Sequence, residues 1–177
     1  MAELSDPELV IRCRNGDRGA FEMLVDRYQT PVYNAALRIL HDPLEAEDVS
    51  QCVFLKVYEN LDSFDSKYKL FSWIYRIAVN ESLNARKSRR RYEPLDDIPS
   101  GDRASGRQDD EDVIDRALGR LSPEDRAVVI LKHLDGFSYN DIGFIMDWPN
   151  AKVKSRLYAA RQHLKEIVLA QQVNPRA

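Results

Sequence analysis

One stretch of this 177-residue chain, residues 62–91, combines three kinds of side chain that can bind nucleic acid. A polar loop carries the aromatic residues Phe64 and Tyr68, and the helix predicted after it places Asn80 and Asn84 on its polar face. The stretch ends in a run of arginine and lysine. Aromatic rings stack on unpaired bases, asparagine amides bind base edges, and basic side chains bind phosphates. The stretch fits a nucleic acid whose strands have separated; the alternative is a core helix with a solvated basic end.

Residues 138–164 form a second pattern, which is typical of a helix-turn-helix. Ser138 and Asp141 match a capping box at the start of a short helix, a tight break follows at 147–149, and a longer helix runs from about Asn150. The outer face of the longer helix carries Lys152, Lys154, Ser155, Arg156, Tyr158 and Arg161. Basic residues near the start of such a helix can bind guanine edges or phosphates in the major groove. This pattern favours a duplex-DNA reader over a helical hairpin with a solvated basic face.

Composition and the titratable residues argue against catalysis and against a metal site. His41, His133 and His163 are scattered, and Cys13 and Cys52 have neither metal-ligand nor disulfide spacing. No phosphate loop, nucleophile–base pair or carboxylate pair is evident, so we predict a protein that is not an enzyme and needs no cofactor. The formal net charge of −3 confines any nucleic-acid surface to local patches. Because no apolar run could span a bilayer and the start lacks a signal-peptide pattern, we expect a cytoplasmic protein without membrane insertion.

Helix start signals recur along the chain and strand alternation is absent, which predicts an all-α fold. Asp6 is expected to cap the first helix, and Pro31 is expected to begin a new helix after one at 19–29. Trp73 is expected in a core, and Trp148 is expected to pack under the final helix.

The helix predicted at 44–61 is apolar on two faces. Phe54, Leu55 and Tyr58 form a second strip beside its core positions. A helix of this kind is deeply buried or has a partner outside its own domain.

Residues 93–115 contain nine acidic and two basic residues, together with two prolines and two glycines. This composition predicts a flexible acidic linker in its first part. We therefore expect two small helical domains, 1–92 and 112–177, joined by a flexible acidic linker at 93–111.

Four segments in order along the chain carry a resemblance to a known family. They are AEDVSQCVFLKVY at 46–58, SFDSKYKLFSWIYRIAVN at 63–80, LSPEDRAVVILKHLDGFSYNDIGFIMDWP at 121–149 and VKSRLYAAR at 153–161. The chain resembles the extracytoplasmic-function, or group IV, sigma factors of bacterial RNA polymerase. The match covers both predicted domains in the expected order.

The resemblance implies that the first domain is the family's region 2. Its helix at 44–61 would dock on the clamp helices of the polymerase β′ subunit through Asp48, Gln51, Phe54 and Leu55. The loop and helix after it would bind the non-template strand of the −10 element, with one flipped base held by the loop. The residues expected to contact this strand are Phe64, Ser66, Tyr68, Lys69, Arg76, Asn80, Asn84 and Lys87.

The second domain would be region 4, which binds the −35 element as duplex DNA and touches the polymerase β flap. The expected DNA contacts are the six residues of the outer helix face, Lys152, Lys154, Ser155, Arg156, Tyr158 and Arg161. The acidic linker would lie in the channel later used by RNA. The family normally has an anti-sigma partner that covers the polymerase-binding surfaces.

This sequence departs from the family pattern at three places. Ala151 and Lys152 stand where the family usually has Gly-Thr, Ala159 stands where it often has a basic residue, and Cys52 stands where it commonly has Glu. Because the first two changes alter charge near the groove, we expect a −35 preference particular to this chain.

Two other functions stay open on the sequence. One is a stand-alone helix-turn-helix regulator that binds duplex DNA as a symmetric dimer without polymerase. The other is an all-α adaptor whose basic faces are only solvated. Tight, specific binding by the free protein would favour the regulator, and a loss of salt sensitivity in DNA-binding tests would favour the adaptor.

Overall fold

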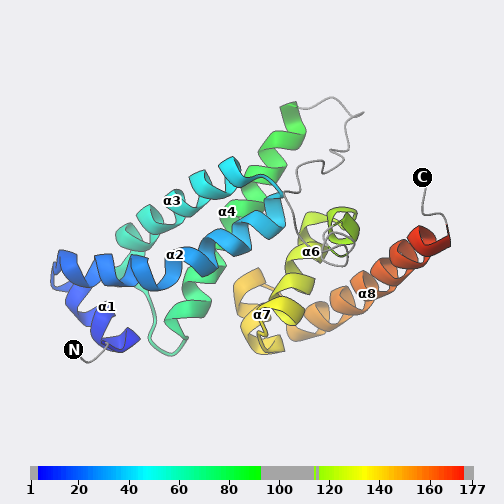
Figure 1. The fold of residues 1–177 in the computed structure, drawn as a ribbon. Coiled ribbons are helices and arrows are strands. Elements are labelled where there is room, and N and C mark those ends of the chain that lie inside the picture. The colour runs from blue at the N-terminus through cyan, green and yellow to red at the C-terminus, as the bar shows by residue number, and fades with distance from the viewer. Residues whose placement is uncertain (1–3, 93–113, 115, 174–177) are drawn as a thin grey trace. The chain divides into compact units, whose positions relative to one another are not determined.

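The computed structural model describes residues 4–92, 114 and 116–173. Within these residues every regular element is helical, which confirms the predicted all-α class (Figure 1). The first elements are α1 (Asp6–Arg14), α2 (Arg18–Leu40), α3 (Pro43–Asn60), the 3-10 turn η1 (Leu61–Ser63) and α4 (Leu70–Tyr92). The later elements are α6 (Pro123–Val129), the π-helical turn η2 (Ile130–Leu134), α7 (Tyr139–Met146) and α8 (Asn150–Val173).

The chain divides into two compact units, Met1–Ala85 and Arg86–Ala177, and the division falls inside α4. The linker predicted at 93–111 lies outside the described residues. The domain boundaries at 92 and 112 therefore stay predictions.

α1 begins with Ser5 as its N-cap, so the expectation that Asp6 caps this helix is wrong. The Glu8 carboxylate accepts hydrogen bonds from the backbone N–H of Ser5 at 2.8 Å and from its hydroxyl at 2.6 Å. Asp6 instead accepts from Arg27 and from the hydroxyl of Tyr28 in α2, both at 2.6 Å. Burial and this hydrogen bond raise the pKa of Tyr28 well above its ordinary value. Asp6 thus anchors α1 to α2.

α2 continues through Pro31, so the expected start of a new helix at this residue is wrong. An interior proline has no N–H to donate and costs a helix about 3 kcal/mol. Tertiary packing offsets this loss. Val32, Ala35 and Ala36 are at most 2% exposed, and Tyr75 of α4 donates its hydroxyl to the Pro31 carbonyl at 3.1 Å. The buried stripe of α2 runs unbroken on both sides of the proline.

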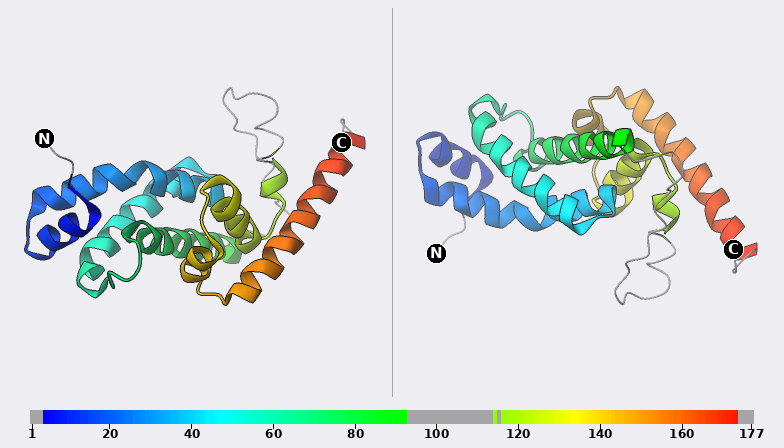
Figure 2. Two further views of the ribbon diagram at one scale, coloured as in Figure 1. Left: turned by 90° about the horizontal axis from the view of Figure 1, so that it is seen from below. Right: turned by 90° about the horizontal axis from the view of Figure 1, so that it is seen from above.

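The core of unit 1 lies where α1, α2, α3 and the first half of α4 meet (Figure 2). Val53 of α3 and Ile74 and Ala78 of α4 are fully buried there, as the helical spacing predicts. Phe54 and Trp73 pack against the cluster with part of their surface exposed. The core therefore uses one face of α4 and leaves the polar face of that helix outside.

The buried guanidinium of Arg126 in unit 2 binds the carbonyls at the end of the helical segment before α6. Arg126 is 2% exposed and donates to the carbonyls of Leu118, Gly119 and Leu121 at 2.8, 2.7 and 3.4 Å. Burial lowers the pKa of Arg126 to about 10. The guanidinium satisfies carbonyls that a helix end leaves without partners.

The π-helical turn η2 follows α6 directly. Gly136, just beyond it, has a φ of +73°, a left-handed conformation that glycine adopts without strain. The helical segment ends at Leu134, two residues before this glycine.

Candidate nucleic-acid interface

A cleft opens in unit 1 between the C-terminal end of α3, η1 and α4. Its volume is about 270 Å³, below the roughly 300–1,000 Å³ of ordinary small-molecule sites. The lining combines amides, a hydroxyl and two opposite charges with an indole and an aliphatic side chain. These residues are Lys56, Asn60, Ser63, Trp73, Ile77, Asn80 and Glu81. Such a lining suits a small planar group with polar edges.

An ion pair joins the two helices at the cleft. The Lys56 ammonium donates to Oε1 of Glu81 at 2.7 Å, and Sγ of Cys52 lies 3.7 Å from Oε2 of the same carboxylate. The hydrogen bond to Glu81 raises the pKa of Lys56 above its ordinary value. Burial and the Glu81 charge raise the pKa of the Cys52 thiol, which disfavours a reactive thiolate. Lys56 therefore reaches the cleft as a fixed cation.

The polar face of α4 continues from the cleft along the helix. Arg76, Asn80, Asn84 and Lys87 follow one another at spacings of three or four residues and so share one face. Asn80, Asn84 and Lys87 are exposed, whereas Arg76 is half-buried. The structure brings these four predicted residues together.

The loop between η1 and α4 separates the predicted contacts into two groups. Ser66, Tyr68 and Lys69 are exposed, and the Lys67 ammonium lies 5.0 Å from the centre of the Tyr68 ring. Phe64 is only 8% exposed, and its ring centre lies 5.3 Å from that of Trp73. The Phe64 ring is therefore buried in this structure, and it supports the lining of the cleft from within the core.

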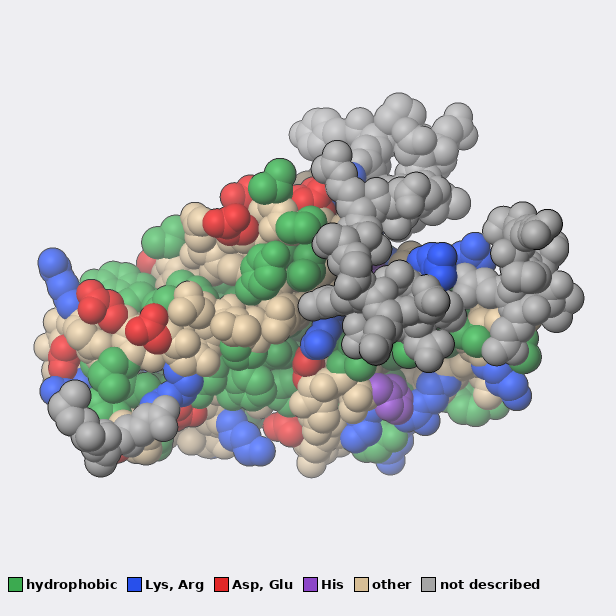
Figure 3. Space-filling view, in the orientation of Figure 1, with side chains coloured by type: hydrophobic (Ala, Val, Ile, Leu, Met, Phe, Trp, Pro, Cys, Tyr) green, Lys and Arg blue, Asp and Glu red, His purple; other side chains and the backbone are tan. Residues whose placement is uncertain are grey.

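The outer face of α3 is exposed and apolar at three positions. Leu44, Leu55 and Tyr58 are 75, 65 and 66% exposed, and Asp48 and Gln51 lie between them on the same face. Figure 3 shows hydrophobic side chains gathered over the face that α2 and α3 form.

Phe54, the fourth predicted polymerase contact, is half-buried against the core of unit 1. Leu44 belongs to the exposed strip but was not among the predicted contacts. It lies about one helical turn before Asp48, the first of those contacts along the chain.

The helix-turn-helix in unit 2 has a tight turn between α7 and α8. Asp147 takes a left-handed conformation with φ of +56°, and the N–H of Trp148 donates to the Gly143 carbonyl at 2.9 Å. A Cβ on Gly143 would lie 2.9 Å from the carbonyl oxygen of Trp148. The capping box of Ser138 and Asp141 is present at the start of α7, which confirms the sequence prediction.

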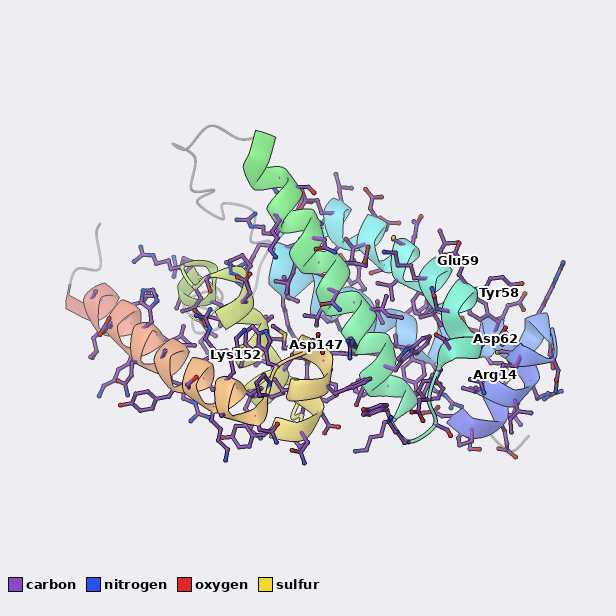
Figure 4. The ribbon with its side chains drawn as sticks, turned by 180° about the vertical axis from the view of Figure 1, so that it is seen from behind. Arg14, Tyr58, Glu59, Asp62, Asp147 and Lys152 are labelled. Atoms are coloured by element: carbon purple, nitrogen blue, oxygen red, sulfur yellow. The ribbon has the colours of Figure 1, made fainter. Side chains whose placement is uncertain are left out.

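The predicted DNA-contacting residues of α8 are brought together on one helix, and Figure 3 shows lysine and arginine side chains along it. Lys152 lies in the first turn of α8 and is labelled in Figure 4. Its ammonium lies 4.2 Å from the centre of the Trp148 ring. Trp148 is half-buried and lies beside the start of α8. Exposed positions on the outer face are Lys152, Lys154, Ser155, Tyr158 and Arg161.

Arg156 differs from the other five residues because it is half-buried and paired. Its Nε lies 2.9 Å from Oδ1 of Asp125 in α6, whose side chain is 17% exposed. The pair connects α8 to α6. Arg156 thus has a structural contact that the sequence did not indicate.

Arg161 is held by a residue that the sequence left without a role. Its Nε donates to Nε2 of His133 on η2 at 3.1 Å. Burial, followed by the charges of Arg161 and Lys132, lowers the pKa of His133 below its ordinary value.

The residues that sequence reasoning missed are those that meet across helices: Lys56, Asn60, Ser63, Ile77, Glu81, Asp125 and His133. None carries a local pattern that distinguishes it from an ordinary surface or core residue. Among the described residues, no group of three His, Cys, Asp or Glu side chains could hold a metal ion, and no helix is long and apolar enough to cross a membrane.

Two family models match this chain. Sigma-70 region 2 matches residues 24–92, and Sigma-70, region 4 matches residues 111–164. The RNA polymerase sigma-H factor of Pseudomonas aeruginosa is 32% identical, over 92% of this chain and 93% of its own. The ECF RNA polymerase sigma-E factor of Escherichia coli is 33% identical, over 90% of this chain and 92% of its own.

Solved structures with the same fold include two protein complexes. CnrH in complex with the cytosolic domain of CnrY has a TM-score of 0.68 and 22% identity, over 92% of this chain and 96% of that chain. The sigma factor RpoE in complex with the anti-sigma factor NepR from Bartonella quintana has a TM-score of 0.69 and 26% identity, over 84% of this chain and 96% of that chain.

The chain belongs to the extracytoplasmic-function sigma factors. It is a promoter-specific transcription initiation factor that binds RNA polymerase, and it is not an enzyme. This function is favoured over the stand-alone regulator and the adaptor.

Proposed function

We propose that this sigma factor reads a two-part promoter and holds an unpaired base of the −10 element in the cleft of unit 1. The cleft is the observation that carries the proposal. Its amides, ammonium and carboxylate can pair with a base edge, and Trp73 and Ile77 can contact the face of a ring. A base inside a duplex has its edge already paired, so the cleft suits the separated non-template strand.

The strand would continue from the cleft along the polar face of α4. Asn84 and Lys87 are exposed beyond Asn80 and can bind the next sugar–phosphate units, with Arg76 at the near end. Ser66, Tyr68 and Lys69 of the loop offer a hydroxyl, an aromatic ring and a cation on the other side. Phe64 is left out of these contacts because its ring is buried.

Unit 2 would bind the −35 element as duplex through the outer face of α8. The exposed charges of Lys152, Lys154 and Arg161 suit phosphates or guanine edges in the major groove, and Ser155 and Tyr158 add hydroxyl donors. Arg156 can contribute charge while it remains paired with Asp125. The tight turn at Gly143 supports this role because it sets α8 against α7.

Lys154→Ala is expected to weaken −35 binding by about fivefold or more. The slope of log affinity against log salt concentration should become shallower by about one, which corresponds to one fewer released counterion. The physical reason is the loss of one exposed cation, whose nearest described ring contact is a distant one, 5.9 Å from the centre of Tyr139. Footprints of reconstituted holoenzyme at several salt concentrations measure the effect. Lys165→Ala, also exposed on α8, is the matched control. Equal footprints for wild type and Lys154→Ala, with polymerase binding intact, would count against the proposed −35 face.

The exposed strip of α3 would dock on the clamp helices of the polymerase β′ subunit. Leu44, Leu55 and Tyr58 supply apolar area, and Asp48 and Gln51 supply polar contacts on the same face. Phe54 would support this face from beneath. Large apolar side chains left this exposed on one helix face suit a protein partner.

Three further roles follow from the family by analogy. Unit 2 would touch the polymerase β flap, and the linker at 93–111 would lie in the RNA channel. In the similar structure from Bartonella quintana, the sigma factor RpoE is bound to the anti-sigma factor NepR. We propose that this chain also has an anti-sigma factor and acts in the cytoplasm.

Selection of bound sites from a random promoter library by reconstituted holoenzyme tests the whole proposal. The expected result is two selected sequence blocks at a constant separation, with permanganate-reactive thymines starting in the downstream block. Gel shifts of duplex promoter with and without core polymerase provide the control. Tight, specific binding by the free chain alone would contradict the proposal and favour the stand-alone regulator.

A further inference from the structure

Arg14, at the C-terminal end of α1, binds the chain segment that leads into the cleft of unit 1. Nε and Nη2 of its guanidinium donate to the Leu61 carbonyl at 3.2 and 3.0 Å. Nη2 also donates to the carbonyls of Asp62 at 3.2 Å and Phe64 at 2.7 Å. Figure 4 shows Arg14 beside Asp62, where α1 meets the end of α3. One side chain thus holds three carbonyls of η1 and the following loop.

These bonds use a property that arginine has and lysine lacks. Leu61 is the C-cap of α3, and helix ends leave carbonyls without partners, which attract a cation. A planar guanidinium presents several N–H groups in fixed directions, whereas an ammonium is a compact point charge. The Asp62 carboxylate is 4.0 Å away and 91% exposed, so it adds little to the binding of Arg14.

The held segment forms part of the wall of the cleft. Ser63 lies between Asp62 and Phe64, and both Ser63 and Asn60 line the cleft. The Ser63 hydroxyl donates to the Asn60 carbonyl at 2.7 Å, which joins the two lining residues. Arg14 therefore fixes the backbone on both sides of a residue that lines the cleft.

A second route runs from Arg14 to the apolar part of the cleft. The Phe64 carbonyl accepts the shortest of the Arg14 bonds, and the Phe64 ring lies 5.3 Å from that of Trp73. Trp73 lines the cleft. A shift of Phe64 would move the indole against which a base can stack.

We propose that Arg14 is a positioning residue for base selection: it sets the shape of the cleft without touching the DNA. This rests on the proposed function, in which the cleft holds an unpaired base. Arg14 and the rest of α1 lie before the segment matched by the region 2 family model, 24–92, so that match assigns them no part in the site.

The test uses full-length protein in holoenzyme with Arg14→Ala, Arg14→Lys and Arg12→Ala. Arg12 lies on the same helix, is half-exposed and pairs with Asp17 instead, so Arg12→Ala is the matched control. The probes are four labelled non-template strands of a selected promoter that differ only at the most constrained base. The ratio of their affinities measures base discrimination. All affinities are measured at a temperature well below the unfolding midpoint of the least stable variant. Polymerase binding is measured in parallel.

In Arg14→Ala, base discrimination is expected to fall by about tenfold, the weight of one charge-assisted hydrogen bond. Polymerase binding and −35 duplex binding are expected to stay at wild-type levels. Arg14→Lys should restore stability but not discrimination, because it keeps the charge and loses the planar fork. Arg14→Lys also keeps the test valid if Arg14→Ala folds poorly.

Tryptophan fluorescence distinguishes a change in the position of the cleft lining from a general loss of stability in unit 1. The chain has two tryptophans, so Trp148→Phe leaves Trp73 as the reporter at the cleft. Quenching of Trp73 by the preferred strand should be weaker in Arg14→Lys than in Arg12→Ala.

Unchanged discrimination and quenching in both Arg14 variants would overturn the inference while leaving the proposed function intact. An equal loss in Arg12→Ala would also overturn it, because the effect would then belong to α1 in general. If the wild-type holoenzyme failed to discriminate among the four strands, the cleft would not select a base, and the proposed function would fall together with the role of Arg14.

Discussion

Asn80 contributes to the cleft but not to the core, so its side chain can be removed without disturbing the packing of unit 1. Asn80→Ala is expected to reduce promoter opening by roughly tenfold, because a well-placed amide–base contact is worth about 1–3 kcal/mol. Closed-complex formation should change little. Permanganate reactivity of bubble thymines measures opening, with Ser88→Ala on the same helix as the control. Reactivity equal to wild type in Asn80→Ala would refute this role.

Phe64 is the opposite case among the residues first expected to touch DNA. Its ring is buried against Trp73, and removal of a buried phenylalanine costs about 3–5 kcal/mol. Phe64→Ala therefore reports on the stability of unit 1, and a defect in promoter opening would not show that the ring contacts a base. Tyr68, 39% exposed in the same loop, is the better residue for that question.

His133 is expected to make the proposed −35 face sensitive to pH. Protonation removes the Nε2 lone pair that accepts from Arg161 and adds a positive charge beside Arg161 and Lys132. Burial and those two charges lower the folded-state pKa of His133 below 6.5. The contribution of neutral His133 to the free energy of folding is complete above the unfolded-state pKa. It is lost as the pH falls through the folded-state pKa.

Bound phosphate reverses the preference of His133, because a nearby anion favours the imidazolium. The −35 affinity of the holoenzyme is therefore expected to rise as the pH falls from about 7.5 to about 5.5, through the ordinary titration range of histidine. His133→Gln keeps a hydrogen-bond acceptor without titrating, so it should flatten the profile. Duplex affinities across this range provide the measurement. Identical pH profiles for the two proteins would contradict the prediction.

At the scale of elements, the helix-turn-helix depends on a close approach at Gly143. A Cβ there would lie 2.9 Å from the Trp148 carbonyl oxygen and 3.0 Å from Oδ1 of Asn150. Gly143→Ala is expected to lower the stability of unit 2 by about 1–3 kcal/mol through overpacking, although alanine is the better helix former. It should also weaken −35 binding more than binding of the −10 strand.

Urea unfolding and the two DNA-binding assays check this prediction. Gly119→Ala is the matched control, because nothing lies within 4 Å of a Cβ at that position. A stability of Gly143→Ala equal to wild type would show that the turn can relax without cost.

α3 shows how one helix serves two surfaces. Val49, Val53 and Val57 are buried in the core, while Leu55 and Tyr58 on the outer face are exposed. The inner residues supply the core contacts of α3, and of the outer residues the Tyr58 ring lies 5.1 Å from that of Phe21 in α2. The outer apolar strip is therefore best explained by a partner outside the chain.

At the scale of the whole molecule, each unit has its own buried residues and is expected to fold alone. Fragments 1–92 and 112–177 should each show helical circular dichroism and cooperative urea unfolding, with the smaller fragment marginally stable. An unfolded 112–177 fragment beside a stable full chain would contradict the predicted boundary. It would also indicate that unit 2 needs residues 86–92 to fold, since these residues belong to the second compact unit.

Local patterns along the chain were enough to predict the helical class, the family, and the helix caps that depend on neighbouring residues. Ser138 and Asp141 behave as predicted because a capping box joins residues within one helical turn. The basic face of α8 was predictable for the same reason, since helical periodicity places residues three or four apart on one side.

Contacts between residues far apart along the chain could be seen only in the folded structure. It placed Lys56 and Glu81 at one cleft, buried Phe64, carried α2 through Pro31, and brought Arg14 to the carbonyls of η1. These outcomes depend on packing between residues far apart in sequence, and local propensities carry no information about such partners. Burial and long-range hydrogen bonds therefore decided which polar residues form the site and which aromatic residue supports it from within.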